Sequence, residues 1–312
     1  MLLGRDVAEC AGVLLFEEEI SMTLLPGSLV STDWLEAHLL EPAVRVVDIR
    51  GYVKTVDAGT GDGKQNSTYV GARDEYDEAH IPGAVFIDWT ADITDPNDPV
   101  PAQIAAPKKF ATAMEALGIG NEIDVVVADH SGGHFATRLW WALNYYGHTA
   151  VAILDGGMNK WLSDELPVTD EAPSISATQF IPIANVGVRY LVDDVAAAIS
   201  DPGVTLVDAR DPNQYSGEVY RGSRRGHIPG AINLNAKNLF TPEGTWKRDD
   251  ELRSVVAQAG ITGDEKVVAY CNGGVTATAV LFALDRIGHP NTANYDGSWN
   301  EWGERLDLPV EP

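Results

Sequence analysis

The chain has 312 residues, 45% of them hydrophobic, and a mean hydropathy of −0.10, which is typical of a soluble globular protein long enough for two domains. Its net charge of −24, from 46 acidic and 22 basic residues, repels nucleic acid and anionic membranes and excludes both as main partners. Only two cysteines occur, Cys10 and Cys271, which excludes a disulfide scaffold and favours a reducing cytoplasm. The sequence shows no zinc-type ligand spacing, so we expect no metal or other cofactor.

The N-terminal residues 1–27 are predicted to be an extension that precedes the first domain. Their apolar patch, residues 11–16, is short and runs directly into three glutamates, so we do not expect a signal peptide. No stretch of the chain reaches the length of about 18 apolar residues that a membrane span requires.

Strands and helices alternate along the rest of the chain. Apolar runs without helical periodicity predict buried parallel strands at 44–49, 123–128, 205–207 and 266–270. Amphipathic stretches predict helices at 110–117, 137–146, 192–199 and 251–259. This alternation predicts an α/β fold with two tandem domains, each a parallel sheet flanked by helices. The segment 166–185 has three prolines and little periodicity, so we place a linker at 168–186, between domains at 28–167 and 187–312.

Five sequence blocks occur twice in the same order, which indicates a duplicated unit. The matched blocks are 46–50 with 206–210, 79–84 with 226–231, 125–129 with 267–271, 147–148 with 288–289, and 155–161 with 296–302. In the third block, Asp129 of the first copy stands where the second copy has Cys271.

The loop that begins at Cys271 is the main candidate for chemistry. It follows the predicted strand 266–270, precedes a predicted helix and consists of Cys271, Asn272, Gly273, Gly274, Val275 and Thr276. Unpaired N–H groups at a helix N-terminus stabilise a thiolate and make such a cysteine a nucleophile, and the glycines allow the backbone to curl around the sulfur. A lone cysteine after an apolar strand is also typical of a buried small hydrophobe. The Thr276 hydroxyl would either bond to the sulfur or cap the helix.

Several motifs together resemble the two-domain rhodanese family of sulfurtransferases, which includes thiosulfate and 3-mercaptopyruvate sulfurtransferases. They are Asp-x-Arg, His-Ile-Pro-Gly-Ala, the cysteine loop and Tyr295-Asp296-Gly297-Ser298-Trp299, and the resemblance covers residues 28–312. It implies that the first domain is catalytically silent, and we expect Asp129 there to bond nearby N–H groups. It also implies that Cys271 takes a sulfur from a small anionic donor, becomes a persulfide and passes the sulfur to a thiol or to cyanide. Thioredoxin is one possible acceptor among several.

The two residues after Cys271 bear on the identity of the donor. The thiosulfate enzymes resemble Cys-Arg-Lys-Gly-Val-Thr and the mercaptopyruvate enzymes resemble Cys-Gly-Ser-Gly-Val-Thr. This chain has Asn272 and Gly273, which lack the cationic pair of the first pattern and also the serine of the second. We therefore expect thiosulfate or 3-mercaptopyruvate, with a slight preference for the latter.

The resemblance also suggests where the donor binds. The expected donor-binding residues are Arg221, Arg210, Arg225 and His80. In mercaptopyruvate enzymes an arginine shortly before His-Ile-Pro-Gly grips the substrate carboxylate, and Arg221 approximates that position; arginine suits such capture. A second substrate arginine of that family is replaced here by Gln214. For Arg210 the alternative is an ion pair with an acid of its own domain, and His80 would face the cleft from the silent domain.

Three other functions were weighed against sulfur transfer. A cysteine phosphatase needs an arginine six residues after the cysteine, and this chain has Ala277 there. A cysteine hydrolase would need a histidine and an Asn or Asp partner, but the loop contains no histidine and the sequence indicates no such partner. A non-catalytic tandem rhodanese-like module, for binding or for carrying a persulfide, is the remaining alternative, and it is disfavoured because the second copy retains the cysteine and both loop glycines.

Overall fold

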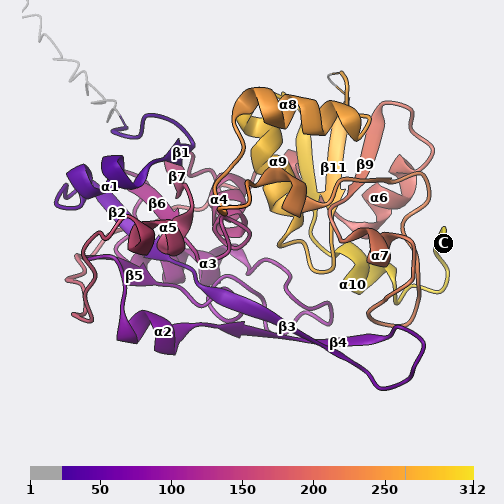
Figure 1. Cartoon of the computed structure of the whole chain (residues 1–312), viewed down its shortest axis with the longest axis horizontal. Helices are drawn as coiled ribbons and strands as arrows, with labels where there is room; N and C mark the ends of the chain where they lie inside the picture. Colours follow the sequence, from indigo (N-terminus) through magenta and orange to yellow (C-terminus); the bar gives the residue numbers. More distant parts are fainter. Residues whose placement is uncertain (1–22, 264) are drawn as a thin grey trace, which may run out of the picture.

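Two five-stranded parallel sheets organise the two halves of the chain in the computed structural model, which describes residues 23–263 and 265–312 (Figure 1). The first sheet has the order β1-β7-β6-β2-β5, and the second has the order β10-β9-β11-β12-β8. All neighbouring strands within each sheet run parallel. Read from its other edge, the second sheet repeats the arrangement of the first, so the duplicated blocks fold into one topology twice.

The first domain runs from β1 to α5. Its sheet strands are β1 (Leu29–Val30), β2 (Val44–Asp48), β5 (Val85–Phe86), β6 (Asp124–Ala128) and β7 (Val151–Leu154). Its helices are α1 (Thr32–His38), α2 (Arg73–Glu78), α3 (Pro107–Ala116), α4 (Ala136–Tyr145) and α5 (Gly157–Ser163). An antiparallel hairpin of β3 (Gly51–Asp57) and β4 (Gln65–Gly71) is inserted between β2 and α2.

The second domain runs from β8 to α10 and lacks such a hairpin among its described residues. Its strands are β8 (Arg189–Tyr190), β9 (Val204–Asp208), β10 (Ile232–Asn233), β11 (Lys266–Tyr270) and β12 (Thr292–Tyr295). Its helices are α6 (Val192–Ala198), α7 (Pro212–Tyr215), α8 (Asp249–Gln258), α9 (Ala277–Arg286) and α10 (Ser298–Trp302). Short 3-10 helices occupy Val186–Val188 and Ala236–Leu239.

Helices cover both faces of each sheet because successive strand residues point to opposite sides. In β6, Val125 and Val127 belong to the core that contains α3 and α4, whereas Val126 and Ala128 belong to the core that contains α1 and α5. The second domain divides in the same way, with α8 and α9 on one face and α6 and α10 on the other. The α/β fold and the strands and helices predicted from periodicity are therefore confirmed.

The two domains share one continuous hydrophobic core that contains both α4 and α9. Trp140 of α4 meets Phe282 of α9 edge-on, with ring centroids 5.1 Å apart. Beside them the Thr278 hydroxyl donates to the Thr137 hydroxyl at 2.9 Å across the domain boundary. The helix that follows the cysteine loop thus packs against the first domain.

The chain segments outside the two sheets attach to the first domain. Of the predicted extension 1–27, residues 1–22 lie outside the described residues, and Thr23 donates to Asp124 at 2.7 Å. In the predicted linker 168–186, Thr169 pairs with His80 and Phe180 packs against Phe110. Among the described residues, no helix combines the length and the apolar character needed to cross a membrane.

Candidate active site

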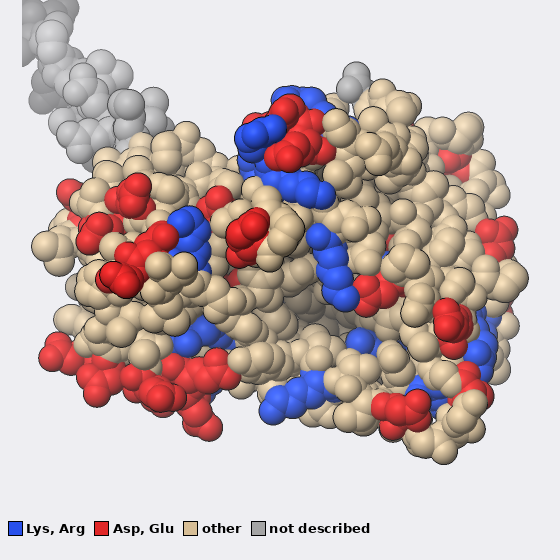
Figure 2. All heavy atoms as spheres, viewed as in Figure 1, with Lys and Arg blue, Asp and Glu red and all other residues tan. Residues whose placement is uncertain are grey.

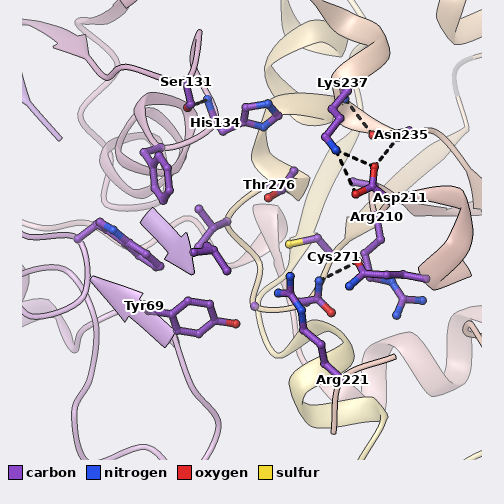
Figure 3. Close-up of a pocket in the computed structure, with 18 residues that line it drawn as sticks. Tyr69, Ser131, His134, Arg210, Asp211, Arg221, Asn235, Lys237, Cys271 and Thr276 are labelled. Carbon is purple, nitrogen blue, oxygen red and sulfur yellow. Dashed lines mark hydrogen bonds and ion pairs between the residues drawn. The ribbon is translucent and has the colours of Figure 1, made fainter. Parts of the chain in front are cut away.

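Cys271 lies at the carboxyl end of β11, at the bottom of a cavity of about 360 Å³ between the two domains (Figure 3). Its side chain is almost fully buried, with 3% of the residue exposed. The first domain contributes Val53, Tyr69, Trp89, Ser131, His134 and Phe135 to the cavity wall. The second domain contributes Ala209, Arg210, Asp211, Gln214, Arg221, Asn235, Lys237, Cys271, Asn272, Gly273, Val275 and Thr276. The cavity therefore belongs to neither domain alone.

The loop from Cys271 to Thr276 holds its backbone N–H groups free for a ligand. In the part of the chain that the structure describes, no hydrogen-bond acceptor meets the N–H groups of residues 272–276. Gly274 adopts a φ of +70°, and any Cβ there would lie 2.7 Å from the Asp296 carbonyl oxygen. Only glycine fits this turn, and its conformation lets the unpaired N–H groups serve an anion.

The equivalent loop of the first domain shows what such a turn can hold. The Asp129 carboxylate accepts from the N–H groups of Ser131 and Gly133, both at 2.9 Å. It also accepts from Phe135 at 2.8 Å and Ala136 at 3.0 Å. The predicted role of Asp129, bonding nearby N–H groups, is confirmed. One buried negative charge is thus held by backbone dipoles at the position that corresponds to Cys271, without a cationic side chain.

The cysteine loop is held in place by hydrogen bonds to residues of α10. The Cys271 N–H donates to the Ser298 hydroxyl at 3.1 Å, and the Cys271 carbonyl oxygen accepts from the Trp299 N–H at 3.0 Å. The Asn300 N–H donates to the Asn272 carbonyl oxygen at 2.7 Å. Because these bonds fix the backbone of Cys271 and Asn272, they also fix the position from which the Cys271 side chain projects.

A buried charge network fixes the other side of the loop. Arg138 of α4 donates to the Gly274 carbonyl oxygen at 3.1 Å and to the Asp296 carboxylate at 2.7 Å. Arg138 and Asp296 are fully buried, and Asp296 also accepts from the Ile104 N–H and pairs with Arg189, both at 3.0 Å. The Gly274 carbonyl is therefore held by a cation of the first domain.

Arg221 is the cation of the cavity that lacks an acidic partner among the described residues. One of its Nη atoms donates to the Thr55 hydroxyl at 2.8 Å, and its buried Nε has no partner in the described chain. Burial lowers the pKa of Arg221 from its ordinary value. An unpaired guanidinium edge beside a nucleophile is suited to a carboxylate or another small anion.

The other cations of the cavity are already neutralised. Arg210 pairs with Asp208 through several hydrogen bonds of about 2.9 Å and donates to the Gly226 carbonyl oxygen at 2.8 Å. Lys237 pairs with Asp211 at 3.0 Å. Lys and Arg side chains nevertheless gather around the hollow at the centre of Figure 2. Acidic side chains dominate the lower left edge of the molecule, over the first domain. An anion approaching this very acidic protein therefore meets a locally basic entrance.

Comparison with known proteins identifies the chain. The Rhodanese-like domain family model matches residues 31–164 and again residues 191–305. The chain is 36% identical over 286 residues to 3-mercaptopyruvate sulfurtransferase of Escherichia coli, covering 91% of this chain and 97% of the relative. The chain belongs to the two-domain rhodanese family of sulfurtransferases.

Two further likenesses support this assignment. A putative thiosulfate sulfurtransferase of Haloferax volcanii is 35% identical over 299 residues, covering 91% of this chain and 96% of the relative. The crystal structure of SseA, a 3-mercaptopyruvate sulfotransferase of Escherichia coli, superposes with a TM-score of 0.74 at 34% identity, covering 87% of this chain and 98% of that one. The rhodanese fold is therefore shared over both domains.

The structure places the predicted donor-binding residues of this rhodanese in two groups. Arg221 and Arg210 line the cavity with Cys271, and the acid pairing considered for Arg210 is present. Arg225 instead pairs with Asp62 at 3.2 Å, outside the cavity. His80 is also outside it, because its ring is buried and its nitrogens face the carbonyl oxygens of Tyr76 and Glu171 at 2.8 and 3.2 Å. We therefore leave Arg225 and His80 out of the proposed site.

Thr276 has one of its two expected roles excluded. It stands at the N-cap position of α9, but its φ of −63° is helical and its side chain makes no capping hydrogen bond. The hydroxyl lines the cavity instead. Capping is therefore not its role, and bonding to a ligand on the sulfur stays open.

Sequence reasoning missed residues that the first domain brings to the rhodanese site. Tyr69 reaches the cavity from the hairpin, and His134 reaches it from the loop that begins at Asp129 (Figure 3). Burial lowers the pKa of His134, so its imidazole is neutral at pH 7. One signal was available: 30 positions separate Arg50 from His80, but only 17 separate Arg210 from His227, which points to an insertion in the first copy.

Proposed function

We propose that this rhodanese moves a sulfane sulfur from 3-mercaptopyruvate or thiosulfate, with a slight preference for 3-mercaptopyruvate, through a persulfide on Cys271 to a thiol or to cyanide. The observation that carries the proposal is the loop itself, whose unpaired N–H groups surround a cysteine at the position where the other domain holds a carboxylate. Such a turn stabilises both the thiolate and the persulfide anion without a formal cation.

The reaction is a double displacement. The Cys271 thiolate attacks the donor sulfur, and the bond from that sulfur to the rest of the donor breaks. With 3-mercaptopyruvate the electron pair of the carbon–sulfur bond leaves as the enolate of pyruvate, which takes up a proton; with thiosulfate the leaving group is sulfite. An acceptor thiolate or cyanide then attacks the outer sulfur of the persulfide, the sulfur–sulfur bond breaks, and the Cys271 thiolate returns.

The preference for 3-mercaptopyruvate rests on the charges of the cavity. Arg221 supports binding of one carboxylate, whereas Arg210 and Lys237 are paired with acids and Asn272 and Gly273 carry no charge. A dianion such as thiosulfate would gain from a second unpaired cation close to the sulfur. We therefore expect Arg221 to bind the donor carboxylate, with Arg210 beside it.

The acceptor is proposed at the level of its chemistry. A small thiol, cyanide or a protein thiol such as that of thioredoxin would satisfy the second displacement. We expect the reaction to take place in the cytoplasm, and with a net charge of −24 we expect neither nucleic acid nor membrane as a partner.

Mass spectrometry and steady-state kinetics test the proposal together. The purified chain is exposed to each donor and measured for the gain of one sulfur atom on Cys271, with Cys271→Ser as the blank. The values of kcat/KM for 3-mercaptopyruvate and thiosulfate are then compared with cyanide as acceptor. Loss of all sulfur uptake from both donors would overturn the proposed function, and a large preference for thiosulfate would overturn the choice of donor.

A further inference from the structure

The β3–β4 hairpin of the first domain has no counterpart among the described residues of the second domain. It leaves the first domain after β2 and extends along the lower edge of the molecule until its tip reaches the second domain near α7 and α10 (Figure 1). A two-stranded ribbon is marginally stable alone in water, so its conformation depends on what it packs against.

The hairpin tip is bonded to the second domain through backbone and side chains. The Gln65 N–H donates to the Tyr220 carbonyl oxygen at 2.8 Å, and the Tyr220 N–H donates to the Gly63 carbonyl oxygen at 3.1 Å. The Tyr220 hydroxyl donates to Asp62 at 2.7 Å, and Asp62 pairs with Arg225 at 3.2 Å. The residue held by these bonds, Tyr220, directly precedes Arg221 in the chain.

The two faces of the hairpin have different surroundings because side chains alternate along a strand. Val53 and Tyr69, which are register partners, line the cavity that contains Cys271. Thr55 and Gln65 line an adjoining polar cavity of about 440 Å³ that shares Arg221 with the first. The alternate positions, including Lys54 and Thr68, line neither cavity and are exposed. One face of the hairpin therefore belongs to the site, and the other faces solvent.

Arg221 is oriented by the inner face of this hairpin. The Thr55 hydroxyl accepts from an Nη of Arg221 at 2.8 Å and lies 3.1 Å from the Ser67 hydroxyl, so Thr55 can donate to Ser67 while it accepts from the guanidinium. The Tyr69 phenol also interacts with Arg221, and its oxygen accepts from Asn300 at 3.2 Å. No described carboxylate pairs with Arg221, so the hydroxyl groups of the hairpin set the orientation of its guanidinium.

We propose that the β3–β4 hairpin of the silent domain is a donor-binding element. In it, Thr55 is a positioning residue that orients the Arg221 guanidinium toward the anionic group of the donor. Tyr69 forms the cavity wall beside that guanidinium. This inference rests on the proposed function, because it concerns the donor that Cys271 attacks. The sulfur chemistry belongs to the second domain, and the hairpin acts on the binding of the donor rather than on the sulfur.

The expected signature is a change in donor KM without a comparable change in kcat. Thr55→Val removes the hydroxyl that orients Arg221 and keeps the shape of the side chain. Because a hydrogen bond to a charged group is lost, we expect the KM of the donor to rise about tenfold. A group that acts equally on the bound ground state and the transition state changes KM and leaves kcat alone.

The hairpin supplies its own matched control. Thr68→Val is the same substitution on the outer face of β4, and we expect its KM to equal that of the wild type. Thr55→Ser keeps the hydroxyl and should restore the wild-type KM, which a merely structural role of the threonine methyl would not allow. Tyr69→Phe, which keeps the ring, should also raise KM.

The measurement uses the full chain with each donor, and the second displacement is followed separately by adding cyanide to protein already loaded with sulfur. We expect that discharge of the persulfide is the same in Thr55→Val, Thr68→Val and the wild type. Equal donor KM values for Thr55→Val and Thr68→Val would overturn the role of the hairpin, even if sulfur transfer itself is intact. If wild-type Cys271 gains no sulfur from either donor, the proposed function fails instead.

Discussion

The two loops that follow β6 and β11 occupy equivalent places and hold different side chains. The first loop, residues 129–135, closes on the Asp129 carboxylate with four backbone N–H bonds. The second, residues 271–276, is one residue shorter, and the N–H groups of residues 272–276 have no acceptor among the described residues. The comparison teaches that the fold supplies equivalent turns twice: the first holds a carboxylate and stabilises the structure, and under the proposed function the second performs sulfur chemistry.

Cys271→Asp would break this comparison most severely. We expect sulfur transfer to fall to background, because a carboxylate cannot carry sulfur, while the folded state stays at least as stable as that of Cys271→Ser. The reason is that the new carboxylate can accept from the N–H groups of its own loop, which are equivalent to those that Asp129 uses in the first domain. Persulfide formation by mass spectrometry and thermal unfolding check both expectations. Unfolding of Cys271→Asp well below Cys271→Ser would show that the two turns are not equivalent.

Arg138→Met would test how far the second loop depends on the first domain. It removes the bond to the Gly274 carbonyl and leaves Asp296 without one of its two arginines. We expect kcat/KM to fall by about 100-fold, because a small misplacement of the groups around a reacting atom is enough for such a loss. Kinetics are normalised to folded protein by circular dichroism.

Arg189→Met is the matched control for that experiment. It removes the other arginine that pairs with Asp296. The Arg189 side chain is 22% exposed and makes no hydrogen bond to the cysteine loop within the described residues. We expect a much smaller change in kcat/KM than in Arg138→Met. Equal losses in the two variants would mean that Asp296, and not the Gly274 carbonyl, is what matters.

Asp129→Ala would test the stabilising half of the comparison. It leaves four N–H groups without their acceptor, three of them buried and that of Ser131 part-buried. We expect the free energy of unfolding to fall by about 3 kcal/mol, since each unsatisfied buried group is costly. Asp129→Asn keeps one side-chain acceptor and should lie between the alanine variant and the wild type in urea denaturation. A wild-type stability for Asp129→Ala would contradict the role of this carboxylate.

The smallest expected effect concerns pH. Burial lowers the pKa of His134 and of His148, both in the first domain, below their value in the unfolded chain, about 6.5. The unfolded state therefore binds protons more readily as the pH falls through 6.5, and stability that is present above that pH is lost below it. Urea denaturation at about pH 7.5 and about pH 5.5 measures the loss. His148→Gln should reduce this difference, and an unchanged difference would exclude His148 as a source.

Local patterns predicted the parts of this molecule that depend on neighbours in sequence. The strand 266–270, the helix after it and Cys271 between them follow from apolar periodicity and glycine placement, and the structure has them where expected. The placement of Arg221 near Cys271 was implied by the resemblance to the mercaptopyruvate enzymes, through its position shortly before His-Ile-Pro-Gly, and Arg221 lines the cavity. These features are encoded within a few residues, so a single sequence suffices to find them.

Contacts between the domains were not predictable in the same way. Arg138 lies 136 residues from Gly274, and nothing in the sequence around either residue names the other. The hairpin was missed because its strands are polar and exposed on one face, so they lack the apolar run that signals a sheet strand. His80 was placed near the cleft by resemblance, but here its ring nitrogens face the carbonyl oxygens of Tyr76 and of Glu171 in the predicted linker.

The shared cavity wall couples ligand binding to the cohesion of the two domains. Six cavity-lining residues come from one domain and the nucleophile comes from the other, so a donor is fully enclosed only while the two stay together. By mass action, any ligand that binds the closed pair also opposes their separation. An anion such as pyruvate in the cavity should therefore slow proteolysis of the segment between the domains, because the bound ligand stabilises the contact of the first domain with the second.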